Sequence, residues 1–244
     1  MDWIQGIQNF LEKLLVLFHI TGGQPARFPE LGSIRFSNSI ETGLRNIFLE
    51  GQMVFFVTYY HKGYSIQDST KIIHRYLPRE VGELLVYYLW LVVPFLSRIS
   101  LEVFQKPLSE YLFEDLSRKR HKAYSKISGD RFRTIFRRET LSGLGLALNP
   151  SEYRHIAIGI SRRFLSKNLE FQPEDPAGLE DEDMDYEDDI MDLQAAHGSK
   201  TAGIVYARGL LQGKGEILSL KRRFQEASLV SNIISIIFIY IYIP

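Results

Sequence analysis

The chain has 244 residues, of which 45% are hydrophobic, so it is long enough for one sizeable domain with its own core. It contains no cysteine, which excludes disulfides, thiolate nucleophiles and cysteine-ligated metals. The net charge of zero hides an asymmetry: residues 170–192 hold twelve acids and no Lys or Arg, leaving 29 basic against 17 acidic residues elsewhere. A basic body suits a polyanionic partner, and a solvated surface with a disordered acidic loop explains the charge equally well.

The first half of the sequence predicts two helices followed by a small sheet. Apolar residues at helical spacing predict an amphipathic helix over 3–20, which has neither the basic leader nor the cleavage site of a signal peptide. A Gly-Gly-Gln-Pro turn then breaks the helix, and a second short helix is expected from Pro25 to Ile34. Runs rich in β-branched and aromatic residues, separated by Gly-containing turns, predict three antiparallel strands at Ile47–Glu50, Met53–Tyr60 and Lys71–Tyr76.

The second half reads as helical. A strongly apolar core helix is expected over Glu80–Phe95, with Pro94 marking its end and too few residues for a membrane span. Residues 117–138 hold nine basic residues and one acid, and should form a loop and the start of a helix near Asp130. Further helices are predicted over Pro150–Phe164 and about 199–228, on either side of a disordered acidic insertion at 170–195. The expected fold is therefore a mainly helical α+β domain over residues 1–228, with helices around a three-stranded antiparallel sheet.

The last sixteen residues, 229–244, have no charge and are mostly Ile and Tyr, unlike the sequence before them. Our hypothesis is a non-native tail arising from a frameshift or a retained intron. The alternative is a tail anchor, although sixteen residues are short for a span of about 20.

Five groups of residues are candidates for chemistry. Arg27 follows a glycine turn at a helix start, where its planar fork could grip two oxygens of one phosphate and Glu30 could orient it. Lys62 lies in the turn after the second strand. Arg154 and His155 interrupt an apolar stretch. His197 precedes Tyr206 by nine positions, which is too far along one helix for direct contact, so both could only bind a third group such as a phosphate. Each group also has a purely structural interpretation. Arg27 could form a surface ion pair with Glu30, Lys62 could be a solvent-exposed loop residue, and Arg154 could form a salt bridge with Glu152 or Glu139. His197 could cap a helix, and Tyr206 could belong to the core.

Taken in order, these groups resemble the tyrosine recombinase (phage-integrase) family. That family has an Arg with a following Glu, a Lys in a β-hairpin, His-x-x-Arg-His, Leu-Gly-His, and a Tyr nine residues after that last His. The resemblance covers about residues 14–226 and is closest to fungal versions from mobile elements or from subtelomeric genes with a RecQ-type helicase. It implies the catalytic-core fold of that family and a nuclear protein.

The resemblance also implies a mechanism. Arg27 and Arg154 would bind the scissile phosphate, with Glu30, Ser151 and His155 in support. His197 would hydrogen-bond the phosphate or take the tyrosine proton, and Tyr206 would form a 3′-phosphotyrosine while Lys62 protonates the leaving 5′ oxygen. The basic stretch would contact the DNA backbone through six residues: Arg118, Lys119, Arg120, Lys122, Arg131 and Arg133.

We expect DNA as the partner, a homo-oligomer on DNA, no cofactor, no metal, no small-molecule substrate and no membrane. Two departures from the family pattern bear on catalysis. Ser151 replaces the first His of His-x-x-Arg, and Ala195-Ala196 replaces the Leu before Gly-His. Two alternatives therefore stay open: a catalytically degenerate DNA-binding remnant, and an interaction protein whose acidic strip docks a basic partner.

Overall fold

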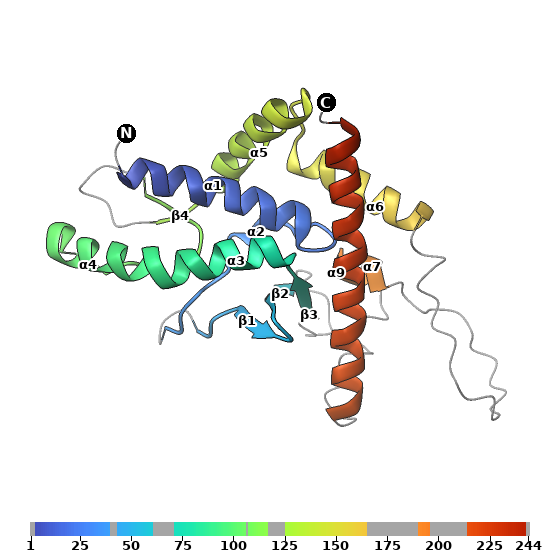
Figure 1. Cartoon of the computed structure of the whole chain (residues 1–244), viewed down its shortest axis with the longest axis horizontal. Coiled ribbons are helices and arrows are strands. Elements are labelled where there is room, and N and C mark those ends of the chain that lie inside the picture. The colour runs from blue at the N-terminus through green and yellow to red at the C-terminus, as the bar shows by residue number, and fades with distance from the viewer. Residues whose placement is uncertain are drawn as a thin grey trace, which may run out of the picture.

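The computed structural model describes residues 3–39, 43–60, 71–105, 107–116, 125–164, 190–195 and 214–242. It is a mainly helical α+β arrangement with a small three-stranded antiparallel sheet (Figure 1). The elements in chain order are α1 (Trp3–Thr21), α2 (Phe28–Leu31), β1 (Ile47–Glu50), β2 (Met53–Tyr60), β3 (Lys71–Tyr76), α3 (Arg79–Tyr87), η1 (Tyr88–Val92), α4 (Val93–Phe104), β4 (Glu114–Asp115), β5 (Ser125–Lys126), α5 (Gly129–Leu144), α6 (Pro150–Phe164), α7 (Ile190–Gln194) and α9 (Lys214–Tyr242).

The three predicted strands are confirmed with the bounds that the sequence indicated. They lie in the order β1-β2-β3, and both pairs are antiparallel. The β1–β2 turn consists of Gly51 and Gln52, both at positive φ (55° and 66°), the conformation of a two-residue hairpin whose twist matches the strands. β2 pairs with β3 from Phe55 opposite Tyr76 to Tyr60 opposite Lys71, so the ten residues 61–70 connect the two strands.

The central strand β2 is buried on both faces of the sheet, and its alternate residues point into two different cores. Val54 and Phe56 belong to the larger core, which is built on α1, α3 and α5. Phe55 and Val57 belong to a second cluster, together with residues of β3, α7 and α9. Figure 1 shows α9 running crosswise past the end of α1, with the short α7 beside it. The sheet therefore joins the N-terminal helices to the C-terminal elements.

The predicted helix over Glu80–Phe95 is longer than expected. α3, η1 and α4 follow one another without a break from Arg79 to Phe104, and Pro94 does not end the run. Pro94, which has no N–H to donate, lies just after the π-helical turn Tyr88–Val92, where the hydrogen-bond register of the helix changes. By length and composition alone, the run Arg79–Val103 could cross a membrane, a property it shares with core helices of soluble proteins. The prediction that this run is too short for a span was therefore wrong.

Two other helix boundaries differ from the predictions. α2 spans only four residues, because the backbone from Gln24 to Arg27 is not helical. α9 continues to Tyr242 instead of ending near Ser228, since nothing between 229 and 242 is a Pro or Gly that would stop it. Ser231 and Asn232 in the apolar tail are buried. The predicted α5 and α6 are confirmed, and the Ser128 hydroxyl caps α5 by accepting from the Arg131 N–H at 3.2 Å.

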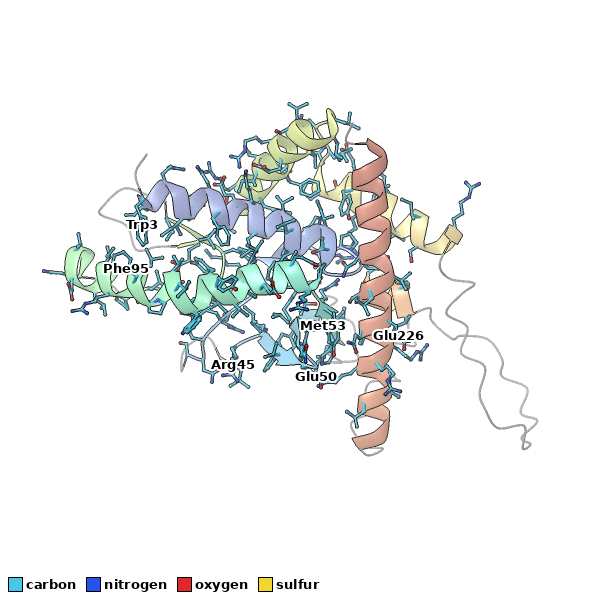
Figure 2. The ribbon with its side chains drawn as sticks, viewed as in Figure 1. Trp3, Arg45, Glu50, Met53, Phe95 and Glu226 are labelled. Atoms are coloured by element: carbon cyan, nitrogen blue, oxygen red, sulfur yellow. The ribbon has the colours of Figure 1, made fainter. Side chains whose placement is uncertain are left out.

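The outer end of the β1–β2 hairpin is tied to α9. Figure 2 places Glu50 and Met53 at this hairpin, next to α9. The Lys221 ammonium donates to a Glu50 carboxylate oxygen at 3.1 Å, and the Tyr76 hydroxyl donates to the other oxygen at 2.9 Å. Glu50 thus links the β1–β2 hairpin to both α9 and β3.

Candidate phosphate site

The turn before Arg27 requires its two glycines. A Cβ on Gly22 would lie 2.7 Å from the Phe18 carbonyl oxygen and 2.9 Å from the Phe56 ring. Gly23 has φ +82°, and its Cβ would lie 2.3 Å from the side-chain oxygen of Gln194. The turn therefore packs directly on the C-terminus of α7. It leaves Arg27 exposed at the start of α2.

Glu30, predicted to orient Arg27, forms an ion pair with Arg75. Glu30 is 7% exposed, and its carboxylate lies 3.9 Å from the Arg75 guanidinium. Burial raises the pKa of Glu30, and the positive charges of Arg75, Arg154 and Arg27, in that order, oppose this shift. Glu30 therefore interacts electrostatically with both sequence-predicted arginines as well as with Arg75.

Arg75, on β3, is the functional candidate that the sequence did not indicate. It is 1% exposed, and its guanidinium donates to three different segments of the chain. Nε bonds the Thr58 hydroxyl at 3.2 Å on β2, one terminal nitrogen bonds the Gln24 carbonyl, and the other bonds the Gln194 carbonyl at 2.6 Å. Burial lowers the pKa of Arg75 to about 10, a value at which it still bears its charge at neutral pH.

Gln194 is the second residue that the sequence did not indicate. Its side-chain oxygen accepts from the Gln24 N–H at 2.8 Å, in the turn that leads to Arg27. Its side-chain nitrogen donates to the Ser228 hydroxyl at 2.8 Å and to the His74 carbonyl at 3.2 Å. One fully buried amide thus joins the glycine turn, β3 and α9.

Arg154, on α6, points inward and reaches the same α7 terminus. It is 9% exposed and donates to the carbonyl oxygen of Ala195. The two salt-bridge partners suggested by the sequence are engaged elsewhere: Glu152 accepts from Asn149, and Glu139 pairs with Arg138. Ser151 and His155 are exposed on α6.

The arginines of this region have more positive charge than their shared acid offsets. Arg27, Arg75 and Arg154 all act electrostatically on the single Glu30 carboxylate. Arg154 also helps lower the pKa of Arg75, as expected for two like charges held close together in a buried region. We call these four residues the arginine cluster. Its excess positive charge suits an anion.

His19 lies at the inner side of the arginine cluster and is neutral. Burial lowers the pKa of His19 to about 3, and the charges of Arg75 and Arg154 lower it too. Its ring packs edge-on against Phe132 and Phe136, 5.2 Å from each centroid. His19 therefore adds no positive charge to the cluster at neutral pH.

Replacing His19 with Leu should flatten the pH dependence of stability on the acid side. The unfolded histidine binds a proton below about pH 6.5, whereas the folded one does so only near pH 3, so its contribution is complete above pH 6.5 and is lost as pH falls. A fully buried histidine contributes a slope of roughly 1.4 kcal/mol per pH unit in this window. Urea unfolding of both proteins at pH 7 and pH 5 measures the difference. If both proteins lose the same free energy of unfolding between pH 7 and pH 5, the lowered pKa of His19 is contradicted.

The two DNA-contact candidates within the described residues pair with acids of the protein itself. Arg131 lies 2.5 Å from the buried carboxylate of Glu12, which also pairs with Arg138 at 2.9 Å. Arg133 is exposed and lies 3.0 Å from Asp130. Arg131 thus has a structural partner, and Arg133 remains at the surface.

The remaining predicted site residues lie outside the described residues: Lys62, Arg118, Lys119, Arg120, Lys122, His197 and Tyr206. Their neighbours in the sequence are described. β2 ends two residues before Lys62, β4 and β5 flank the segment from 117 to 124, and Ala195 precedes His197 by two residues.

Comparison with known proteins gave no family model, no curated protein and no solved structure that matches this chain.

Proposed function

We propose that this chain is a DNA strand-breaking and rejoining protein that acts through a 3′-phosphotyrosine at Tyr206, with the catalytic-core fold of the tyrosine recombinases. The observation that supports it is that Arg154 and the turn before Arg27, far apart in sequence, both reach the C-terminus of α7: Arg154 donates to the Ala195 carbonyl, and the Gln24 N–H donates to the Gln194 side-chain oxygen. The sequence pattern alone proposed that these two arginines share one anion. A phosphate diester is the anion that guanidinium forks bind with two parallel hydrogen bonds.

In this mechanism the protein supplies every group that the reaction needs. Arg27 and Arg154 hold the non-bridging oxygens and stabilise the charge that develops in the transition state. The Tyr206 oxygen attacks phosphorus and loses its proton to His197, while the bond from phosphorus to the 5′ oxygen breaks. Lys62 returns a proton to that oxygen. The phosphotyrosine keeps the energy of the phosphodiester, so a DNA 5′-hydroxyl reverses the step without a nucleotide or metal.

Arg154 must reach the phosphate from its present position. One of its terminal nitrogens donates to the Ala195 carbonyl, and a guanidinium has five N–H groups in a planar fork. In the proposed complex Arg154 would bind the phosphate through N–H groups other than the one that donates to Ala195. The exposed Arg27 would approach the same phosphate from the α2 side.

A nicked suicide DNA substrate tests the proposal. Because the 5′-hydroxyl fragment diffuses away after cleavage, the wild-type protein should accumulate a covalent DNA adduct that survives denaturing electrophoresis. Tyr206→Phe should bind the same DNA and form no adduct, because the phenylalanine ring has no nucleophile. An adduct that persists in Tyr206→Phe would refute the assignment.

A DNA-binding remnant without chemistry is the second candidate. Ser151 favours it, since a serine hydroxyl cannot exchange a proton near neutral pH as the family's histidine can. In the same assay this candidate predicts salt-sensitive DNA binding by the wild type with no adduct at any time.

A further inference from the structure

We propose that Arg75 is a positioning residue for this strand-cleavage site, an inference that rests on the proposed function. Arg75 holds the turn that presents Arg27 and the end of α7, where Arg154 is anchored, in one fixed arrangement. No sequence pattern assigned it a role.

The hydrogen bonds of Arg75 exclude a direct role with substrate. All three of its guanidinium nitrogens donate within the protein, and the side chain is 1% exposed. DNA cannot reach it. Its effect on a phosphate must therefore pass through the segments that it connects.

Those segments are the ones that hold the proposed phosphate ligands. The Gln24 carbonyl that accepts from Arg75 lies three residues before Arg27. The Gln194 carbonyl that accepts at 2.6 Å is adjacent to the Ala195 carbonyl that accepts from Arg154. Two guanidinium groups thus bind successive carbonyls at the C-terminus of α7, where the carbonyl dipoles favour cations.

Arg75 also lies beside the one acid of the arginine cluster. Its guanidinium lies 3.9 Å from Glu30, one turn after Arg27 on α2. Through Thr58 on β2 the same side chain is anchored to the sheet, which is the most extensively paired element of the fold. The sheet therefore sets the relative position of Arg27 and Arg154 through Arg75.

The planar fork of Arg75 explains why a lysine would not replace it. Arg75→Lys keeps the charge beside Glu30, and so should fold, but a single ammonium cannot bond Thr58, Gln24 and Gln194 in their present directions. The backbone segments would then shift by a fraction of an ångström to about 1 Å. A displacement of that size is enough to slow chemistry about 100-fold without loss of binding.

The experiment compares single-turnover adduct formation and DNA affinity in the wild type, Arg75→Lys and Ile127→Ala. Ile127 is buried in the core built on α1, whereas α7 belongs to the second cluster, so the truncation of Ile127 destabilises the fold away from the hydrogen bonds of Arg75. All three proteins are assayed where circular dichroism shows them fully folded. We expect Arg75→Lys to form adduct about 100-fold more slowly, with a dissociation constant for DNA within about threefold of wild type. Ile127→Ala should match the wild type in both.

Each other outcome overturns a defined part of the account. A wild-type rate in Arg75→Lys, or an equal slowing in Ile127→Ala, would refute the positioning role and leave the proposed function intact. A wild type that forms no adduct would refute both. Hydrogen exchange gives a readout independent of DNA: Arg75→Lys should speed amide exchange in residues 190–195 and 22–24, and unchanged exchange there would also refute the positioning role.

Discussion

Replacing Arg154 with Ala is expected to slow adduct formation by about 10²–10³-fold, the cost of removing one donor that stabilises a transition-state oxyanion. Arg154 is one of two sequence-predicted phosphate ligands, and it reaches the arginine cluster from a different helix than Arg27. Its loss also leaves the Ala195 carbonyl without this donor. The effect should therefore exceed that of an exposed cation outside the arginine cluster.

Two control variants separate charge from geometry in this result. Arg154→Lys keeps the charge and loses the fork, so its adduct rate should lie between those of wild type and Arg154→Ala. Arg98→Ala removes an exposed arginine on α4 and should leave the rate within a few-fold of wild type. An Arg154→Ala protein that is folded and reacts at the rate of Arg98→Ala would show that Arg154 does not contact the phosphate.

The second large effect concerns stability. Arg131→Ala combined with Arg138→Ala is expected to lower the free energy of unfolding by roughly 3 kcal/mol, the lower end of the cost of leaving a buried charge unpaired. Glu12 is 1% exposed and pairs with both arginines, which are themselves 37% and 50% exposed. The two arginines themselves contribute little to the free energy of unfolding, because water screens their charges. Most of the lost stability comes from the buried Glu12 carboxylate, which is left without a partner of opposite charge.

Adding Glu12→Gln to the double variant tests this explanation. The glutamine amide has the same size and no charge, so most of the lost stability should return. Urea unfolding of the wild type, the double variant and the triple variant gives the comparison. If the triple variant is no more stable than the double one, the stranded charge is not the cause, and loss of packing by the arginine side chains is the better explanation.

The sequence predicted the sheet and several helices because their signals are local. The β-branched and aromatic run Met53–Tyr60 and the Gly51 turn define a hairpin within one short stretch of sequence, and the helix predicted over Pro150–Phe164 matches α6. Pro94 misled the prediction because its effect depends on the π-helical turn before it. A π-helical turn leaves no clear pattern in a single sequence.

The site could be predicted only in part, for a related reason. Arg27 and Arg154 were indicated by the motif order, whereas Arg75 lies in a predicted strand to which the sequence assigned no chemistry. Its partners are at Gln24, Glu30, Thr58 and Gln194, and no local spacing joins positions so far apart. A charged residue between Ile73 and Leu77, in an otherwise apolar run, was the one available signal. That signal indicates a partner without saying which.

The most direct test of the central claim is to identify the amino acid that is bound to DNA. Adduct from the suicide substrate is digested with nuclease and protease, and the nucleotide-bearing peptide is sequenced by tandem mass spectrometry. The account predicts a nucleotide 3′-phosphate linked to the Tyr206 oxygen and to no other tyrosine. A linkage to another residue, or the absence of any covalent linkage while the wild-type protein binds the DNA, would contradict it.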